Sequence, residues 1–136
     1  MFSHLSNSGF AFELPVYIDR LMRSKDEDAF LTIQVAQSED FLQLTGDNNG
    51  VQLDFPMITS RQRGYEKKIR SAAASANLVV VENHGSDGAL FLDIDLEGPS
   101  QMIAAVCSRM LREIFSVGDD TGLIFQHVGL APDTAA

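Results

Sequence analysis

The sequence predicts an α+β domain in which an antiparallel sheet of about five strands carries its helices on one face. Two stretches, residues 51–55 and 90–96, alternate aliphatic with polar side chains. That period of two describes a strand with one buried and one wetted side. Three other segments place apolar residues at helical spacing. Runs of consecutive strands separated by helices are typical of the α+β class, with helices packed on one sheet face.

The first half of the chain predicts a helix followed by a three-stranded meander. The helix is expected to begin at Leu14, with Pro15 in its first turn, where a missing N–H is tolerated. A polar loop and then a turn rich in Asn and Gly, which accept the positive φ of tight hairpins, separate the strands. The loop and turn are residues 36–40 and 46–50, and the strands are 29–35, 41–45 and 51–55.

The second half predicts a helix, a hairpin and a long final helix. Thr59 or Ser60 can cap the first of these helices, and Gly64 weakens it by roughly 1 kcal/mol relative to alanine. Gly118 is expected to end the last helix as a left-handed cap. The helices are expected at residues 60–76 and 100–117, and the strands at 78–82 and 89–96, with a weak strand at 123–128. The predicted order is therefore α-β-β-β-α-β-β-α.

Length and composition predict one cytoplasmic domain. The 136 residues suit a single core, expected over residues 12–128 between a flexible leader (1–11) and a frayed tail (129–136). No apolar run approaches the ~20 residues of a membrane helix, and the first residues lack the features of a signal peptide. With one cysteine no internal disulfide is possible, which fits a reducing compartment.

The net charge of −9 argues against general affinity for nucleic acid or anionic lipid, since both need a basic surface. Half of the ten basic residues nevertheless fall between Arg61 and Arg70. This basic stripe is either the solvated face of a helix or a contact for phosphate or an acidic partner.

No residue set in the sequence assembles into a catalytic site, and we expect neither an enzyme nor a bound cofactor. Asp93 and Asp95 lie two apart on one strand, so their carboxylates point the same way. With His84 they offer a hypothetical site for a small molecule or hard cation, although the wetted face of a sheet explains them more simply. His84 and His127 are expected at the surface or an edge, and Cys107 faces the core as an unreactive thiol.

Three aromatic side chains interrupt the polar face of the predicted sheet. Phe30, Phe41 and Phe91 each lie opposite the aliphatic side of their strand. Together they form either an apolar interaction surface or a patch covered by a loop, the N-terminal arm or the C-terminal strand. Candidate residues for binding a partner are Phe30, Phe41, Phe91, Met102, Met110 and Phe115.

The pattern of elements resembles the chaperone fold of type III secretion and its bacterial relatives, the TY-Chap and YbjN-like domains. The resemblance covers about residues 12–117. It is carried by the strands 29–33, 41–44 and 50–55, the helix through Tyr65 and the hairpin 78–96. It implies a non-enzymatic protein that dimerises and binds an extended client segment. Those domains carry a tryptophan-containing segment after the second helix, whereas this chain has no tryptophan.

From these observations we expect a chaperone-like module that captures an extended or amphipathic client segment, acting as a homodimer. Apolar grooves and backbone pairing at a sheet edge would hold the client. The alternative is a small-molecule or metal sensing domain that uses Asp93, Asp95 and His84.

Overall fold

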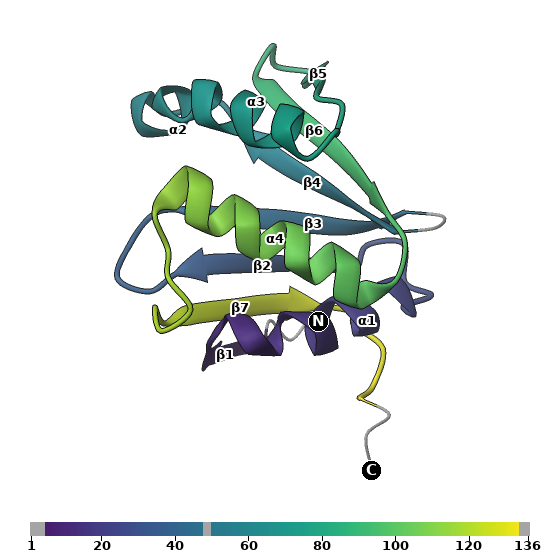
Figure 1. Ribbon diagram of the computed structural model, residues 1–136. Coiled ribbons are helices and arrows are strands. Elements are labelled where there is room, and N and C mark those ends of the chain that lie inside the picture. The colour runs from purple at the N-terminus through teal and green to yellow at the C-terminus, as the bar shows by residue number, and fades with distance from the viewer. Residues whose placement is uncertain (1–4, 48–49, 134–136) are drawn as a thin grey trace.

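A single antiparallel sheet organises the structure, and Figure 1 shows the helices lying on one side of it. The computed structural model describes residues 5–47 and 50–133. Within them the sheet has seven strands in the order β1-β7-β2-β3-β4-β6-β5. The strands are β1 (Leu5–Gly9), β2 (Phe30–Val35), β3 (Phe41–Asp47), β4 (Gly50–Pro56), β5 (Val81–His84), β6 (Leu90–Glu97) and β7 (Leu123–Val128).

The helices cover the aliphatic face of the sheet and close the core. They are α1 (Leu14–Met22), α2 (Ser60–Gly64), α3 (Glu66–Ser75) and α4 (Ser100–Phe115), with a 3₁₀ turn at Ala11–Glu13 before α1. Every second residue of β2, β3, β4 and β6 enters this core, and α1 and α4 pack against each other above it. The α+β class and the alternation on which it was predicted are confirmed.

The prediction of about five strands is wrong, because the sheet has seven. The additional outer strand is β1, formed by residues that the sequence predicted to be a loose leader. It pairs with β7 from Leu5 opposite His127 to Gly9 opposite Leu123. Its side chains are largely exposed and polar, so backbone pairing carries it and no hydrophobic alternation announces it. Residues 1–4 of the predicted leader lie outside the described part of the chain.

The pairing with β1 changes the position of β7 and of His127. Since β7 lies between β1 and β2, it is an interior strand. His127 is buried, its Nε2 lies 3.2 Å from the Asn7 Oδ1, and its ring contacts Tyr17. The prediction of a surface or edge histidine is therefore wrong for His127, because the strand that covers it was not predicted.

The chain after β7 is also held in place where fraying was predicted. The backbone N–H of Ala131 donates to the Arg20 carbonyl, and the Arg20 Nε donates back to the Ala131 carbonyl at 2.7 Å. Arg23 adds a hydrogen bond to the Pro132 carbonyl. Residues 129–132 therefore belong to the domain through contacts with α1, while residues 134–136 lie outside the described part.

Two predicted helices differ from the structure at a local boundary. The helix expected at 60–76 is divided at Tyr65 into α2 and α3, and Thr59 caps α2 by accepting from the Gln62 N–H at 3.1 Å. The last helix, α4, ends at Phe115, and Ser116 rather than Gly118 adopts the left-handed conformation. Of the predicted turn 46–50, positions 48 and 49 lie outside the described residues.

A close backbone approach makes Gly50 necessary where β4 meets β6. A Cβ at this position would lie 1.9 Å from the Leu96 carbonyl oxygen, so any side chain would force the two strands apart. Gly50 therefore fixes the pairing that sets the register of β4 and β6.

The thiol of Cys107, a residue of α4, is fully buried in the hydrophobic core of the domain. Burial raises the pKa of this thiol to about 12, because the thiolate would lose its hydration. We expect no reaction with a disulfide reagent such as DTNB in the native state, and one thiol per chain after unfolding in guanidinium. Rapid labelling of the folded protein would contradict this placement.

Candidate binding cavity and outer sheet face

A cavity of about 230 Å³ opens at the end of the sheet where β3 begins and β4 ends. The loop before β3 forms one wall, and α2 with the start of α3 forms another. Phe115, at the C-terminal end of α4, completes the wall of the cavity. The lining is mainly apolar: Phe41, Phe55, Pro56, Met57, Ile69 and Phe115, together with Tyr65.

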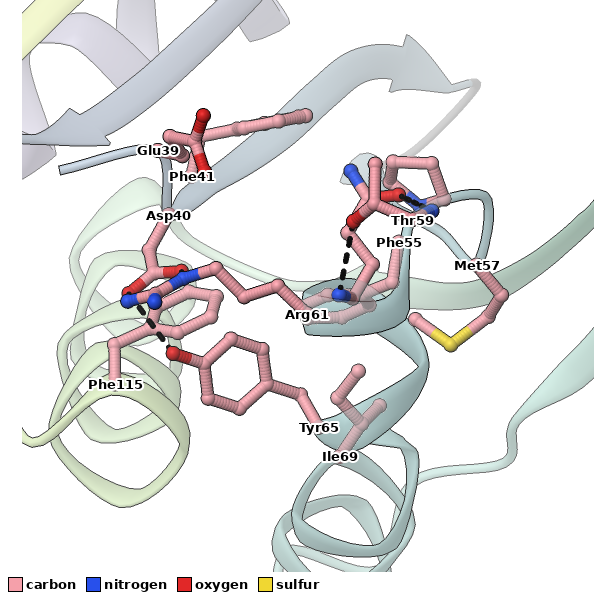
Figure 2. A pocket seen from close by; sticks show the side chains of 12 residues that line it. Glu39, Asp40, Phe41, Phe55, Met57, Thr59, Arg61, Tyr65, Ile69 and Phe115 are labelled. Carbon is pink, nitrogen blue, oxygen red and sulfur yellow. Dashed lines mark hydrogen bonds and ion pairs between the residues drawn. The ribbon is translucent and has the colours of Figure 1, made fainter.

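The buried carboxylate of Asp40 organises the polar side of the cavity. Asp40 is 8% exposed and accepts two hydrogen bonds from Arg61, at 2.8 and 3.0 Å, and one from the Tyr65 hydroxyl at 3.0 Å. Figure 2 shows Arg61 extending from α2 to this carboxylate, with Phe41 above it and Tyr65 below it in the view. The three polar groups thus satisfy one another at the rim of the cavity.

The same contacts shift the pKa values of Asp40 and Tyr65. The Arg61 hydrogen bonds hold the pKa of Asp40 below its usual range, and they outweigh the opposing effect of burial. The pKa of Tyr65 is raised, first by burial and then by its hydrogen bond to Asp40. At neutral pH the cavity therefore holds an ionised Asp40 and a neutral Tyr65, neither of which is poised to transfer a proton.

Two aromatic rings stand at right angles inside the cavity. The ring centroids of Tyr65 and Phe115 are 5.0 Å apart, with an interplanar angle of 83°. This edge-to-face arrangement is the one that aromatic quadrupoles favour. Because Tyr65 also bonds Asp40, the pair holds the C-terminal end of α4 against α3 and fixes the shape of the cavity.

The structure brings several of the predicted partner-binding residues together. Phe41 and Phe115 both line the cavity, although 73 intervening positions separate them in the chain. Pro56, another lining residue, pairs with Phe91 on the neighbouring strand. An apolar row therefore leads from the cavity across the outer face of the sheet, through Phe41, Pro56 and Phe91.

Other predicted residues lie elsewhere. Phe30 is four residues along β2 from Gln34, the residue that pairs with Phe41, which places it about 13 Å from that row. Met110 is fully buried in the core, so the structure does not present it to a partner. Met102 is 63% exposed near the start of α4, away from the cavity. Helical spacing places Met110 on the inward stripe with Cys107, as the structure confirms, and leaves Met102 off that stripe.

A band of polar residues crosses the outer face next to the apolar row. Along the register, Thr32 pairs with Gln43, Gln43 with Asp54, Asp54 with Asp93, and Asp93 with Val81. Within this band two carboxylates, Asp54 and Asp93, are directly opposite each other on neighbouring strands. Like charges in that position are destabilising, and their Cβ atoms are about 5 Å apart in such pairs.

The facing carboxylates favour a shared proton. The pKa of Asp54 is raised to about 6, chiefly by burial and then by the charge of Asp93 and by a hydrogen bond that protonated Asp54 donates to it. The Oδ1 atoms of both residues are buried, and among the described residues they have no donor other than the proton that Asp54 carries when it is protonated. Asn83 donates to the Asp93 Oδ2 at 3.2 Å.

The residues of the alternative sensing hypothesis are divided between faces of the sheet. Asp93 and Asp95 belong to the outer face, as their alternation predicted. His84 pairs with Leu90, one residue out of phase, so its side chain belongs to the opposite face. Within residues 5–47 and 50–133 no three His, Cys, Asp or Glu side chains are grouped to hold a metal ion.

The basic stripe of α2 and α3 is largely engaged within the chain. Arg61 bonds Asp40, Arg63 donates to the Ile58 carbonyl and to Ser60, and Arg70 pairs with Glu66 and Glu82. Lys67 and Lys68 are exposed. These contacts favour the interpretation of the stripe as a solvated helix face over a phosphate site.

Sequence reasoning missed Asp40 and Asp54. Asp40 stands in a polar loop, and nothing local indicates that Arg61, 21 positions later, would reach it. Asp54 was placed correctly on the wetted face, but its importance depends on the strand register that sets it against Asp93. An acidic residue at a strand start, followed by a distant arginine, is too common a pattern to identify such a pair.

Comparison with protein-family models, curated proteins and solved structures finds no match to this chain. No helix in the described residues combines the length and apolarity needed to cross a bilayer. The cavity, the outer face and the charges of the chain are therefore the features that indicate a function.

The Asp54 pair predicts a stability that falls as pH rises. The folded state holds the Asp54 proton more tightly than the unfolded chain does. The resulting contribution to the free energy of unfolding is therefore full below about pH 4 and is lost as pH rises through about 6. Asp54→Asn should remove this dependence and raise the free energy of unfolding at pH 7 by about 1–2 kcal/mol. Urea denaturation at pH 5 and pH 7 measures both effects.

The matched control is Asp95→Asn, which removes a carboxylate from the same strand and face but one that is exposed and bonded to Gln52. This variant should keep the pH dependence of the parent. Equal pH dependence in the parent and in Asp54→Asn would contradict the shared proton.

Proposed function

We propose that the protein is a non-enzymatic, chaperone-like binding module that holds an extended or amphipathic segment of a client protein. The observation that carries this proposal is the apolar cavity, with its continuation onto the outer face through Phe41, Pro56 and Phe91. An anchor side chain of the client enters the cavity, and the neighbouring client residues lie along that row.

The size and chemistry of the cavity support a side-chain anchor over a small-molecule substrate. Small-molecule pockets usually measure roughly 300–1,000 Å³, and this cavity is about 230 Å³. Of its charged groups, Asp40 and Arg61 already bond each other and Glu39 is exposed, and Gln62 bonds the backbone N–H groups of Ile58 and Thr59. What remains for a ligand is mainly aromatic and aliphatic surface.

Exposed strands at both edges of the sheet supply the second part of the proposed mechanism. All four residues of β5 are exposed, and β1 is exposed along most of its length. An edge strand presents unpaired N–H and C=O groups to which an extended peptide can add.

With a single cysteine, which is buried, the chain suits a reducing cytoplasm.

A homodimer is the assembly that we propose, with its contact at the β1 edge. Four exposed apolar side chains belong to β1, the 3₁₀ turn with its preceding residue, and α1: Leu5, Phe10, Phe12 and Val16. We call them the β1 patch. Phe12 is 79% exposed, and its ring stacks on that of Phe10 at 6.5 Å between centroids. Large exposed apolar groups next to an edge strand favour association with a second copy.

The cavity predicts a matched difference between two phenylalanines of one hairpin. Phe41 and Phe30 are both half-buried on the outer face of adjacent strands, but only Phe41 lines the cavity. Selection from a displayed random-peptide library should enrich peptides with one large apolar residue. Phe41→Ala should weaken their binding by about tenfold or more, because truncating an anchor residue typically costs about 2 kcal/mol or more.

Phe30→Ala is the control and should leave peptide binding within about twofold of the parent, with thermal melts confirming that both variants fold. Equal weakening by the two variants would contradict the cavity as the anchor site. The absence of any enriched apolar residue would contradict the proposed function.

The β1 patch predicts the assembly state. Light scattering at several protein concentrations should report a dimer, and Phe12→Glu should convert it to a monomer because the charge would be buried at the contact. Met102→Glu, which changes an exposed apolar residue elsewhere, is the control and should remain dimeric. A monomeric parent, or a dimeric Phe12→Glu variant, would contradict this assembly.

A further inference from the structure

A second hollow, of about 310 Å³, lies on the outer face of the sheet beside the β5 edge. It shares no lining residue with the cavity described above. Three carboxylates, two amides and an exposed valine contribute to it, and the complete lining is Gln52, Val81, Glu82, Asn83, Asp93 and Asp95. Asp54 lies next to it, opposite Asp93.

Asp93 is an unusual residue to find on this face. It is only 6% exposed, and when Asp54 is ionised its Oδ1 has no hydrogen-bond donor in the described part of the chain. Its other oxygen accepts from Asn83. A buried carboxylate oxygen without a donor costs free energy, so its presence calls for a partner. The Asp54 Oδ1 opposite has the same deficiency.

The side chains that line the hollow do not neutralise the negative charge of Asp54 and Asp93. Of the groups that line the hollow, Asp95 and Glu82 are acidic, and Glu82 is already bonded to Arg70. Neither a lysine nor an arginine lines it. With Asp54 ionised, the residues that line the hollow offer the pair no positive group.

We infer that this hollow is a binding site for the guanidinium group of an arginine on a partner protein. The inference rests on the proposed protein-binding function, because it names the chemistry of part of the client. A guanidinium is planar, carries several donors in a fixed fork, and can bond two carboxylates at once. The net charge of −9 draws basic segments to the protein at long range.

The β5 edge offers a route by which such an arginine arrives. A strand that adds to β5 lies about 5 Å from it and about 10 Å from β6, on which Asp93 stands. Every second side chain of the added strand points to the outer face. An arginine there can lie over Val81, the residue that pairs with Asp93, and place its head group on the carboxylates. Binding of the cation displaces the proton that the pair shares.

A designed peptide tests the inference without knowledge of the natural client. The probe is a fluorescent eight-residue peptide that alternates threonine with arginine, and its control replaces each arginine with citrulline, a neutral isostere. At neutral pH the arginine peptide should bind about tenfold or more tightly than the citrulline peptide. Equal affinity for the two peptides would overturn the inference.

Charge-matched variants locate the binding on the protein. Asp93→Asn should abolish the preference for arginine, and Asp54→Asn should reduce it while leaving a folded protein. Asp119→Asn, in the exposed loop after α4, changes the net charge equally and should retain the preference. A preference that is largely retained, and equally so, in all three variants would mean that the attraction is general, which would overturn the site.

Calorimetry provides a second readout that general attraction would not produce. Titration near pH 6 in two buffers of different ionisation enthalpy should show proton release by the parent and none by Asp54→Asn. Binding without proton release by the parent would overturn the displacement of the shared proton. A melting temperature raised by Ca²⁺ or Mg²⁺ and unchanged by the arginine peptide would overturn the inference in favour of a metal site.

The outcome can be separated from that of the proposed anchor cavity. Phe41→Ala should leave the arginine preference unchanged, because the two sites share no residue. Failure of the peptide-library selection together with a retained arginine preference would reject the cavity alone. Success of that selection with no arginine preference would reject the hollow alone.

Discussion

Burial of one face of the sheet against α1 and α4 is the constraint on which the rest of the structure depends. The aliphatic residues of β2, β3, β4 and β6 alternate with polar ones, so covering the aliphatic side commits every intervening side chain to the other face. Removal of such apolar surface from water is the main favourable contribution to folding. The outer face is therefore a by-product of the core, and its composition is free to serve recognition.

The cavity lies at the end of the sheet where β3 begins and β4 ends. At the start of β3 and the end of β4, side chains of α2, α3 and the end of α4 meet those of the loop before β3. The Asp40 carboxylate, in the loop before β3, accepts hydrogen bonds from Arg61 of α2 and from Tyr65 at the start of α3. One carboxylate thus joins the three elements. The polar network thus supports the cavity walls, while the apolar side chains remain available to a ligand.

The acidic pair illustrates a second consequence of the register. Cross-strand pairing sets Asp54 against Asp93, and the neighbouring strand β5 brings Asn83 to one oxygen but no cation to the others. The arrangement is unfavourable in isolation. A protonated pair at low pH and an external cation at neutral pH are two ways to relieve the same repulsion. The proposed arginine site and the pH dependence of stability therefore have one physical origin.

Much of the fold was predictable because it depends on local periodicity. The meander, the second hairpin and the three main helices followed from patterns of two and of 3.6 residues, and the face assigned to Phe30, Phe41 and Phe91 was consistent with the strand pairing. The pattern did not indicate β1, whose exposed polar residues are held by backbone hydrogen bonds to β7. Helical spacing did place Met110 on the core side of the last helix and Met102 off it, as the structure shows.

The sequence alone therefore determined the class of fold, the covered face and the acidic character of the chain, since each follows from residue types and their spacing. Only the tertiary structure decided which distant residues meet: Phe41 with Phe115, Asp40 with Arg61, and Asp54 with Asp93. Those meetings depend on strand order and on how helices pack at the sheet end. Both are set by the sum of many long-range contacts, so a local pattern does not contain them.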